Sequence, residues 1–211
     1  MPRIARFTVQ NGFYHVLSRG HSQTEIFHEP QDCQKYLDIL AEQRKQNSLS
    51  LFHYCLMPNH VHMIVSSPDG KSLSQAMRSV NQRYAQYYRK KFGGTGYLWQ
   101  DRFKSYLVQD GPHLLAAGRF VEHVPVTSRI CLKPEDYLWS SYNIYAFGRA
   151  GAHVELDPEY VKLGSTSEER MEKYRALALE GRNERRRVER YFKQGALGDK
   201  FVYLNPGAPG G

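Results

Sequence analysis

Several features that would place this chain in a familiar class are missing. No apolar run in the 211 residues is as long as a membrane span, and the first residues lack the apolar core of a signal peptide. Only three cysteines are present, Cys33, Cys55 and Cys131, and no two form a C-x-x-C pair. This odd, scattered set argues against a disulfide framework or a zinc knuckle. The sequence therefore predicts a cytoplasmic protein with no membrane partner.

The chain has fewer acidic than basic residues. Lys and Arg number 29 against 21 Asp and Glu, which gives a formal net charge of +8. A basic balance favours a polyanionic partner such as nucleic acid, although many basic proteins bind none. Hydrophobic residues make up 41% of the chain, which is enough for a packed core. The length fits one domain with an appendage.

The segment that carries recognisable chemistry is residues 54–65, which read YCLMPNHVHMIV. His60 and His62 flank one valine, and residues two apart in a β-strand share a face. Two neighbouring imidazoles can act as a pair of metal ligands. The alternative is two polar side chains on the solvent face of a half-buried strand. We expect Val61 and Ile64 to turn toward a core.

Periodicity and turn residues predict the order strand, helix, strand, strand, helix, strand, helix. The predicted strands cover residues 13–20, 50–56, 60–66 and 97–105, and the predicted helices cover residues 30–46, 72–91 and 111–124. Beyond about residue 150 the composition changes to short helical segments.

Basic and aromatic side chains alternate along the second predicted helix, and five arginines occur within residues 182–190. Rings that stack on bases and cations that follow phosphates are what a single-stranded DNA groove requires. A solvated basic helix face is the alternative for both segments. The candidate DNA contacts are Arg78, Arg83, Tyr84, Arg89, Lys90, Lys91, Arg185, Arg186 and Arg187.

The segment LMPNHVHMIV resembles the HUH motif of the single-tyrosine transposases, most closely the branch of REP-associated tyrosine transposases. Further similar segments are YHV running into Arg19-Gly20, WQDRF at residues 99–103 and WSSY at residues 139–142. The resemblance covers residues 1 to about 147. It implies an α+β, ferredoxin-like (RRM-like) sandwich, in which an antiparallel central sheet carries helices on one face. The implied parts are a DNA-binding and nicking domain over residues 1–149, a basic helical C-terminal extension over residues 150–205 and a disordered tail over residues 206–211.

The resemblance also implies a function. Members of this family nick and rejoin single-stranded or hairpin DNA through a 5′-phosphotyrosine, with a divalent metal held by the two histidines. Here this implies Mg²⁺ or Mn²⁺ at His60 and His62. The long tail is similar to that of the REP-associated members, which favours a monomer over a homodimer. The implied DNA contacts are Arg19, Arg102 and Lys104, with Trp99 packing or stacking.

The family's nucleophile segment, of the form Arg-Tyr-Ile-Glu-x-Asn-Pro-Val, aligns with RFVEHVPV at residues 119–126. Phe120 therefore stands at the tyrosine position and Val124 at the asparagine position. Because a phenyl ring has no oxygen, Phe120 cannot attack a phosphodiester. Glu122 and His123 are the candidates for a substitute metal ligand, in place of the polar group that Val124 lacks.

This departure predicts a chain deficient in cleavage, through natural loss or through an engineered substitution. A different tyrosine, such as Tyr106 or Tyr142, is the remaining route to a covalent intermediate. The alternative functions are a non-catalytic nucleic-acid-binding regulator on the same scaffold and, less favoured, a metal-dependent hydrolase of another phosphodiester.

Overall fold

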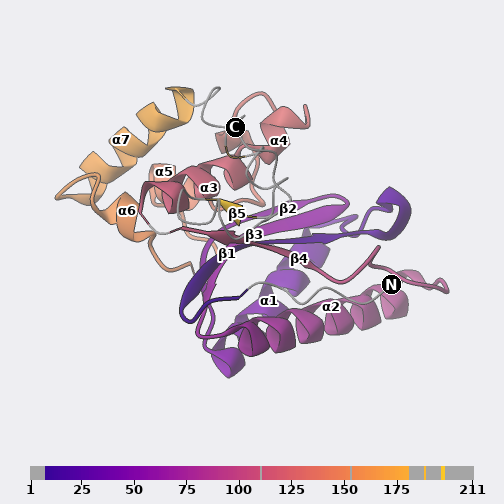
Figure 1. Cartoon of the computed structure of the whole chain (residues 1–211). Helices are drawn as coiled ribbons and strands as arrows, with labels where there is room; N and C mark the ends of the chain where they lie inside the picture. The colour runs from indigo at the N-terminus through magenta and orange to yellow at the C-terminus, as the bar shows by residue number, and fades with distance from the viewer. Residues whose placement is uncertain (1–7, 110, 153, 181–187, 189–195, 198–211) are drawn as a thin grey trace, which may run out of the picture.

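The computed structural model describes residues 8–109, 111–152, 154–180, 188 and 196–197. A five-stranded sheet of order β2-β3-β1-β4-β5 forms its centre (Figure 1). The first four strands pair antiparallel, and β5 lies parallel to β4. The strands are β1 (Gly12–Arg19), β2 (Ser50–Met57), β3 (His60–Ser67), β4 (Lys104–Val108) and β5 (Ala196–Leu197). The antiparallel ferredoxin-like core predicted from the sequence is thereby confirmed.

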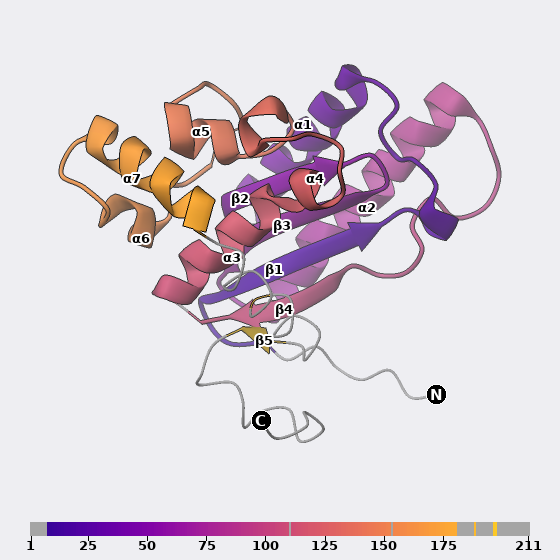
Figure 2. The ribbon, with the colours of Figure 1, turned by 90° about the horizontal axis from the view of Figure 1, so that it is seen from above.

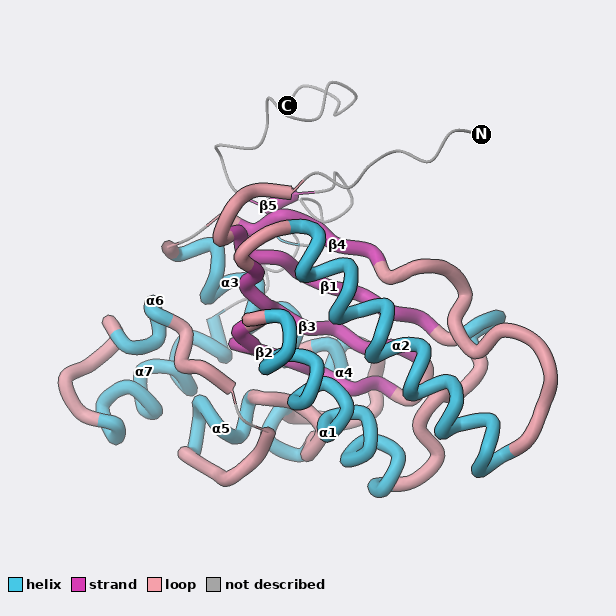
Figure 3. Tube along the Cα trace, turned by 90° about the horizontal axis from the view of Figure 1, so that it is seen from below, coloured by secondary structure: helices cyan, strands magenta, loops and turns pink. Residues whose placement is uncertain are grey.

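Helices cover both faces of the sheet, so the expectation of helices on one face is wrong. The face shown in Figure 3 carries α1 (Pro30–Asn47) and α2 (Gly70–Phe92). The other face carries α3 (Pro112–Glu122) and the later helices (Figure 2). The remaining helices are α4 (Val124–Thr127), α5 (Tyr142–Phe147), α6 (Pro158–Val161) and α7 (Ser167–Glu180), with 3₁₀ turns at His21–Gln23 and Pro134–Asp136.

The strands themselves explain this arrangement, because their side chains are apolar in both directions. Val61 and Met63 of β3 belong to the core beneath α1 and α2, as expected for Val61. Ile64 instead belongs to a second core beneath α3. It lies on the same face as His60 and His62, since all three are separated by even numbers of residues.

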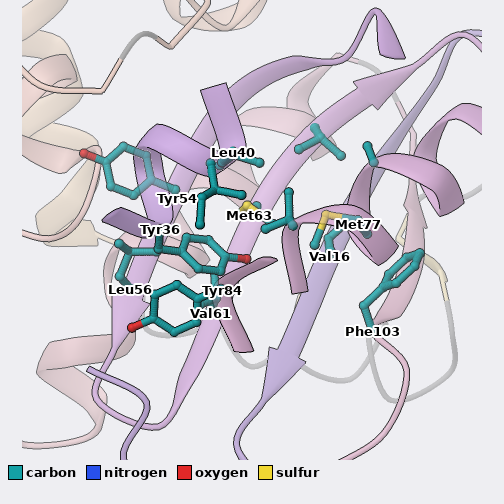
Figure 4. Packing of buried hydrophobic residues seen from close by; sticks show 14 of the residues in the cluster. Val16, Tyr36, Leu40, Tyr54, Leu56, Val61, Met63, Met77, Tyr84 and Phe103 are labelled. Atoms are coloured by element: carbon teal, nitrogen blue, oxygen red, sulfur yellow. The ribbon is translucent and has the colours of Figure 1, made fainter. Parts of the chain in front are cut away.

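The first core is built around aromatic rings (Figure 4). Tyr36 of α1 and Tyr84 of α2 are fully buried, with ring centroids 5.3 Å apart. The Tyr84 hydroxyl donates a hydrogen bond to the backbone oxygen of Ile26 at 2.5 Å. Burial of each such ring stabilises the fold by about 2 kcal/mol, and the contact between the two rings joins α1 to α2.

The fourth strand begins later than predicted. Residues 97–103 form a connection that touches the sheet through an isolated bridge between Gly20 and Trp99, and β4 starts at Lys104. The extension contributes α6 and α7, which pack against α5 in a third core. The tail of residues 206–211 and most of the arginine-rich segment lie outside the described residues. Along the described part of the chain, no helix has both the length and the apolarity to cross a membrane.

Candidate metal and DNA site

Three histidines gather on the sheet face covered by α3. His15 comes from β1, while His60 and His62 come from the neighbouring strand β3. The Nε2 atom of His15 lies 2.7 Å from Nδ1 of His62, and the two rings stack with centroids 5.0 Å apart. The His60 ring stands edge-on to His62 at 4.9 Å. The even spacing of His60 and His62 thus places both side chains in one cluster, and His15 completes it.

The hydrogen bonds of the cluster orient its nitrogen lone pairs. Nδ1 of His60 lies 2.6 Å from Oδ1 of Asn59, which can only accept, so Nδ1 carries the proton. This leaves the Nε2 lone pair of His60 for another partner. If His62 donates from Nδ1 to His15, Nε2 of His62 also presents a lone pair. Hydrogen bonds of this kind fix the tautomer of metal-ligating histidines.

Burial keeps these imidazoles neutral. It lowers the pKa of His15 to about 3 and that of His60 to about 4, and the Arg19 cation adds to both effects. Burial, the neighbouring histidines and Arg19 hold the pKa of His62 well below its usual range. Metal ligation requires the neutral form, so the site is ready to accept a cation at neutral pH.

The chain supplies two donor atoms in this cluster rather than a complete coordination sphere. Among the described residues, no group of three or more His, Cys, Asp or Glu side chains is arranged to hold a metal ion. Two imidazole nitrogens fit a divalent ion whose other positions are filled by water and phosphate oxygens. Two imidazoles alone do not select one metal.

Phe120 faces this cluster from α3. Its ring stands edge-on to His15 and His62, with centroid distances of 6.2 and 6.4 Å. The turn of α3 that approaches the histidines therefore presents a phenyl ring.

A family model described as an IS200-like transposase matches residues 8–123, which is more than half of the chain. This chain belongs to the IS200-like transposase family. The matched region contains the histidine cluster and Phe120. No curated protein matches the chain.

Two solved structures are similar to this IS200-like transposase. A REP-associated tyrosine transposase described as bound to a REP hairpin is similar with a TM-score of 0.60 and 15% identity, over 74% of this chain and 93% of that chain. A candidate transposase from Deinococcus radiodurans R1 has a TM-score of 0.39 and 17% identity, over 54% of this chain and 87% of that chain. The first likeness confirms the fold predicted from the sequence.

The two suggested substitute ligands are held elsewhere in the transposase. Glu122 is fully buried, where its carboxylate accepts hydrogen bonds from Ser141 at 2.6 Å and Tyr174 at 2.5 Å. Two positions after Phe120, it projects to another side of α3. His123 ends α3; its Nδ1 lies 2.8 Å from the Arg119 backbone oxygen and its ring stands against Tyr142. Both placements argue against a role as third metal ligand.

The two alternative tyrosines differ in position. The Tyr106 ring stacks on His15 with centroids 5.6 Å apart, so it lies beside the histidine cluster. Tyr142 is buried against His123 and Tyr174 in the third core. Of these two residues, Tyr106 is therefore the one placed near the candidate metal site.

Several predicted DNA contacts on α2 have other roles. Tyr84 is fully buried, so it cannot stack on a base. Arg83 pairs with Glu42 of α1 at 2.5 Å. Lys91 pairs with Asp32 at 2.6 Å and also with Glu29. The stripe predicted to contact DNA is in part the contact between α1 and α2, because the apolar spacing of α2 continues through Tyr84.

The other predicted contacts divide by position. Trp99 packs on the first core, and its Nε1 donates to the Asn81 backbone oxygen at 2.8 Å, so it packs rather than stacks. Arg89 donates to the Gly96 backbone oxygen. The exposed side chains are Arg19, Arg78, Arg89, Lys90, Arg102 and Lys104. Arg185, Arg186 and Arg187 lie outside the described residues.

Arg19 and Lys104 are the predicted contacts nearest to the histidines in strand register. Arg19 lies opposite His60. Lys104 lies opposite Leu17, which in turn lies opposite His62. Residues directly opposite in an antiparallel pair share a face, so both cations project from the face that carries the histidines. The exposed residues of α2 belong to the helix layer on the other face.

Proposed function

We propose that this IS200-like transposase binds single-stranded or hairpin DNA of the REP type and does not cleave it. The observation that carries the proposal is the Phe120 ring, which stands against His15 and His62. The motif resemblance aligns this residue with the family's tyrosine. A phenyl ring has no oxygen to attack phosphorus. The similar structure described as bound to a REP hairpin supports the choice of hairpin DNA.

In this proposal each group at the site has a defined role. His60 and His62 hold Mg²⁺ or Mn²⁺ through their Nε2 atoms, and His15 orients His62. The ion, when bound, acts as a Lewis acid on a phosphate oxygen. Arg19 and Lys104 hold phosphates along the histidine face, because exposed cations next to a phosphate site supply affinity without reading sequence. The protein acts as a monomer.

A non-catalytic regulator that binds nucleic acid without metal is the second candidate. Val124, at the position of the family's asparagine, is buried in the second core at 9% exposure and offers no polar group. Hairpin binding that survives EDTA would favour the regulator. Release of a cleaved product without a protein–DNA adduct would instead point to a hydrolase that uses water.

Restoring the nucleophile tests the assignment of position 120. Phe120→Tyr alone is expected to give weak nicking or none, and Phe120→Tyr combined with Val124→Asn is expected to give more, because the second change returns a polar group one helical turn away. The measurement is incubation with a labelled single-stranded hairpin and Mn²⁺, followed by denaturing electrophoresis. Tyr142→Phe is the matched control and should leave the result unchanged. Equal cleavage by the unaltered protein and the double variant would contradict the assignment.

A further inference from the structure

Two side chains of α3, one on each side of Phe120 in the sequence, bind α7 of the C-terminal extension. The Tyr174 hydroxyl donates a hydrogen bond to Oε2 of Glu122 at 2.5 Å. The Arg119 guanidinium donates to the backbone oxygen of Leu177. The two residues of α3 are three positions apart, and so are the two of α7. One turn of α3 is therefore bound to one turn of α7.

These contacts lie inside the protein. Tyr174 and Glu122 are fully buried, and Arg119 is 9% exposed. A hydrogen bond to a buried carboxylate is strong, and its loss leaves a charged oxygen short of a donor. The contact with α7 therefore opposes displacement of α3.

The Tyr174 ring is itself held in place by other aromatic rings. Its centroid lies 6.1 Å from that of Tyr142, and 5.4 Å from those of Tyr145 and Tyr160. These residues come from α5 and α6 and form the third core with Tyr174. Because the ring packs against two other helices, its hydroxyl is a fixed anchor for α3.

The turn of α3 that α7 holds also carries the ring that faces the histidine cluster. Phe120 stands edge-on to His15 and His62 at 6.2 and 6.4 Å. Successive side chains of a helix point about 100° apart, so Arg119 and Glu122 point away from the direction of Phe120. A rotation or shift of α3 that separated Glu122 from α7 would thus also move the ring at position 120.

The two carboxylate oxygens of Glu122 have different partners. Oε1 accepts a hydrogen bond from Ser141 at 2.6 Å and lies 2.9 Å from Nδ1 of His53 on β2. Oε2 accepts from Tyr174. Loss of the Tyr174 hydroxyl therefore breaks the link to α7 and leaves the link between Glu122 and the sheet in place.

We propose that Tyr174 is a positioning residue for the candidate metal site. Through Glu122, it sets where α3 places position 120 against His15 and His62. The extension is then part of the structure of the site, and the first 149 residues alone do not complete it. The consequence for metal binding rests on the proposed function, whereas the placement of α3 does not.

Nuclear magnetic resonance of the metal-free protein, labelled with ¹⁵N-histidine, tests the placement. Tyr174→Phe removes one hydroxyl and keeps the ring. We expect the ring resonances of His15 and His62 to shift, because the neighbouring Phe120 ring changes their magnetic environment when it moves. The resonances of His28, in the layer on the other face of the sheet, should stay unchanged.

Mn²⁺ affinity in the presence of hairpin DNA is the second measurement. Tyr174→Phe is expected to weaken it about threefold, which is less than the loss of a residue that hydrogen-bonds a metal ligand directly. Arg119→Leu removes the other side-chain contact with α7, and it is expected to shift the same resonances of His15 and His62.

Tyr160→Phe is the matched control. Its hydroxyl donates to the backbone oxygen of Tyr145 at 2.9 Å, so it joins α6 to α5 within the same core and makes no contact with Glu122. We expect it to lower the midpoint of urea denaturation by about as much as Tyr174→Phe, since each change removes one buried hydrogen bond. It should leave the histidine resonances and the Mn²⁺ affinity unchanged.

The outcomes separate a positioning role from a contribution to stability alone. Unchanged resonances of His15 and His62 in Tyr174→Phe would overturn the proposal, and so would equal shifts in Tyr160→Phe. Shifted resonances with unchanged Mn²⁺ affinity would also overturn it, because α3 would then move without effect on the metal. If the unaltered protein bound no Mn²⁺, the proposed function would fail, while shifts confined to Tyr174→Phe would still support the placement of α3.

Discussion

Replacement of His53 by leucine is expected to lower the free energy of unfolding by about 3–5 kcal/mol. His53 on β2 is fully buried between two buried carboxylates: its Nδ1 lies 2.9 Å from Glu122, and its Nε2 lies 3.2 Å from Asp157. Removal of the cation leaves both carboxylates without a compensating charge in an apolar interior. Urea denaturation measures the loss.

The control for this prediction is an exposed ion pair. Lys173 and Glu169 on α7 lie 3.1 Å apart and are about half exposed. Lys173→Ala is expected to cost less than about 1 kcal/mol, since exposed pairs contribute little. Equal effects of His53→Leu and Lys173→Ala would contradict the assignment of a charged network. Gly118 packs directly against this histidine, because a Cβ at this position would lie 2.4 Å from Nε2 of His53.

The same network predicts how stability depends on pH. Burial alone lowers the pKa of His53, but Glu122 and Asp157 outweigh it and raise the pKa to about 9. Because the folded pKa lies above the ordinary value of 6.5, the contribution is complete below pH 6.5 and is lost as the pH rises through 9. The facing phenols, Tyr145 and Tyr174, stay protonated in this window, since burial and Glu122 raise their pKa values.

The difference in unfolding free energy between the unaltered protein and His53→Leu isolates this titration from that of other groups. We expect the difference to be largest near pH 6 and to shrink by pH 9. A difference that is constant across this range would mean that His53 is neutral in the folded protein. Because Asp157 caps the N-terminus of α6 and Tyr174 lies on α7, the network also joins the C-terminal extension to α3.

The second large effect concerns the metal. His60→Ala and His62→Ala are each expected to weaken Mn²⁺ binding in the presence of hairpin DNA more than tenfold, since each removes one of two protein donors. His15→Leu removes the partner of His62 Nδ1 and is expected to weaken binding about tenfold or more. Electron paramagnetic resonance of free Mn²⁺ during titration measures the affinity.

His28→Ala is the matched histidine control for the metal experiment. His28 bonds the Tyr88 hydroxyl at the edge of α2, in the layer opposite the histidine cluster. It should leave Mn²⁺ affinity unchanged. Loss of affinity in His28→Ala equal to that in His62→Ala would indicate nonspecific binding, and unchanged affinity in His62→Ala would remove the proposed site.

Local sequence patterns predict the main elements of the fold and the proximity of two site residues. The even spacing of His60 and His62 is enough to predict that their side chains lie together, because a strand places such residues on one face. The sequence also predicts the burial of Tyr84, because this residue continues the helical spacing of the apolar stripe formed by Leu73, Met77 and Val80. That burial was missed because a tyrosine between basic residues was interpreted as part of a DNA-binding face.

Contacts that depend on tertiary pairing cannot be predicted from local sequence patterns. His15 joins the site only through the register of β1 and β3, which no single segment contains. His53 meets Glu122 and Asp157 across 69 and 104 residues, after a register shift in β2 that changes the alternation. Gly118 is a signal of this contact in the sequence, since an isolated glycine inside a helical pattern can have a packing reason.

The most direct test of the central claim is incubation of the unaltered protein with a labelled single-stranded REP-type hairpin and Mn²⁺. Native electrophoresis reports binding, and denaturing electrophoresis with intact-protein mass spectrometry reports cleavage and covalent attachment. We predict a bound, uncut hairpin and an unchanged protein mass. A covalent protein–DNA adduct would contradict the account, because it would show an active tyrosine other than position 120, with Tyr106 beside His15 as the first residue to replace.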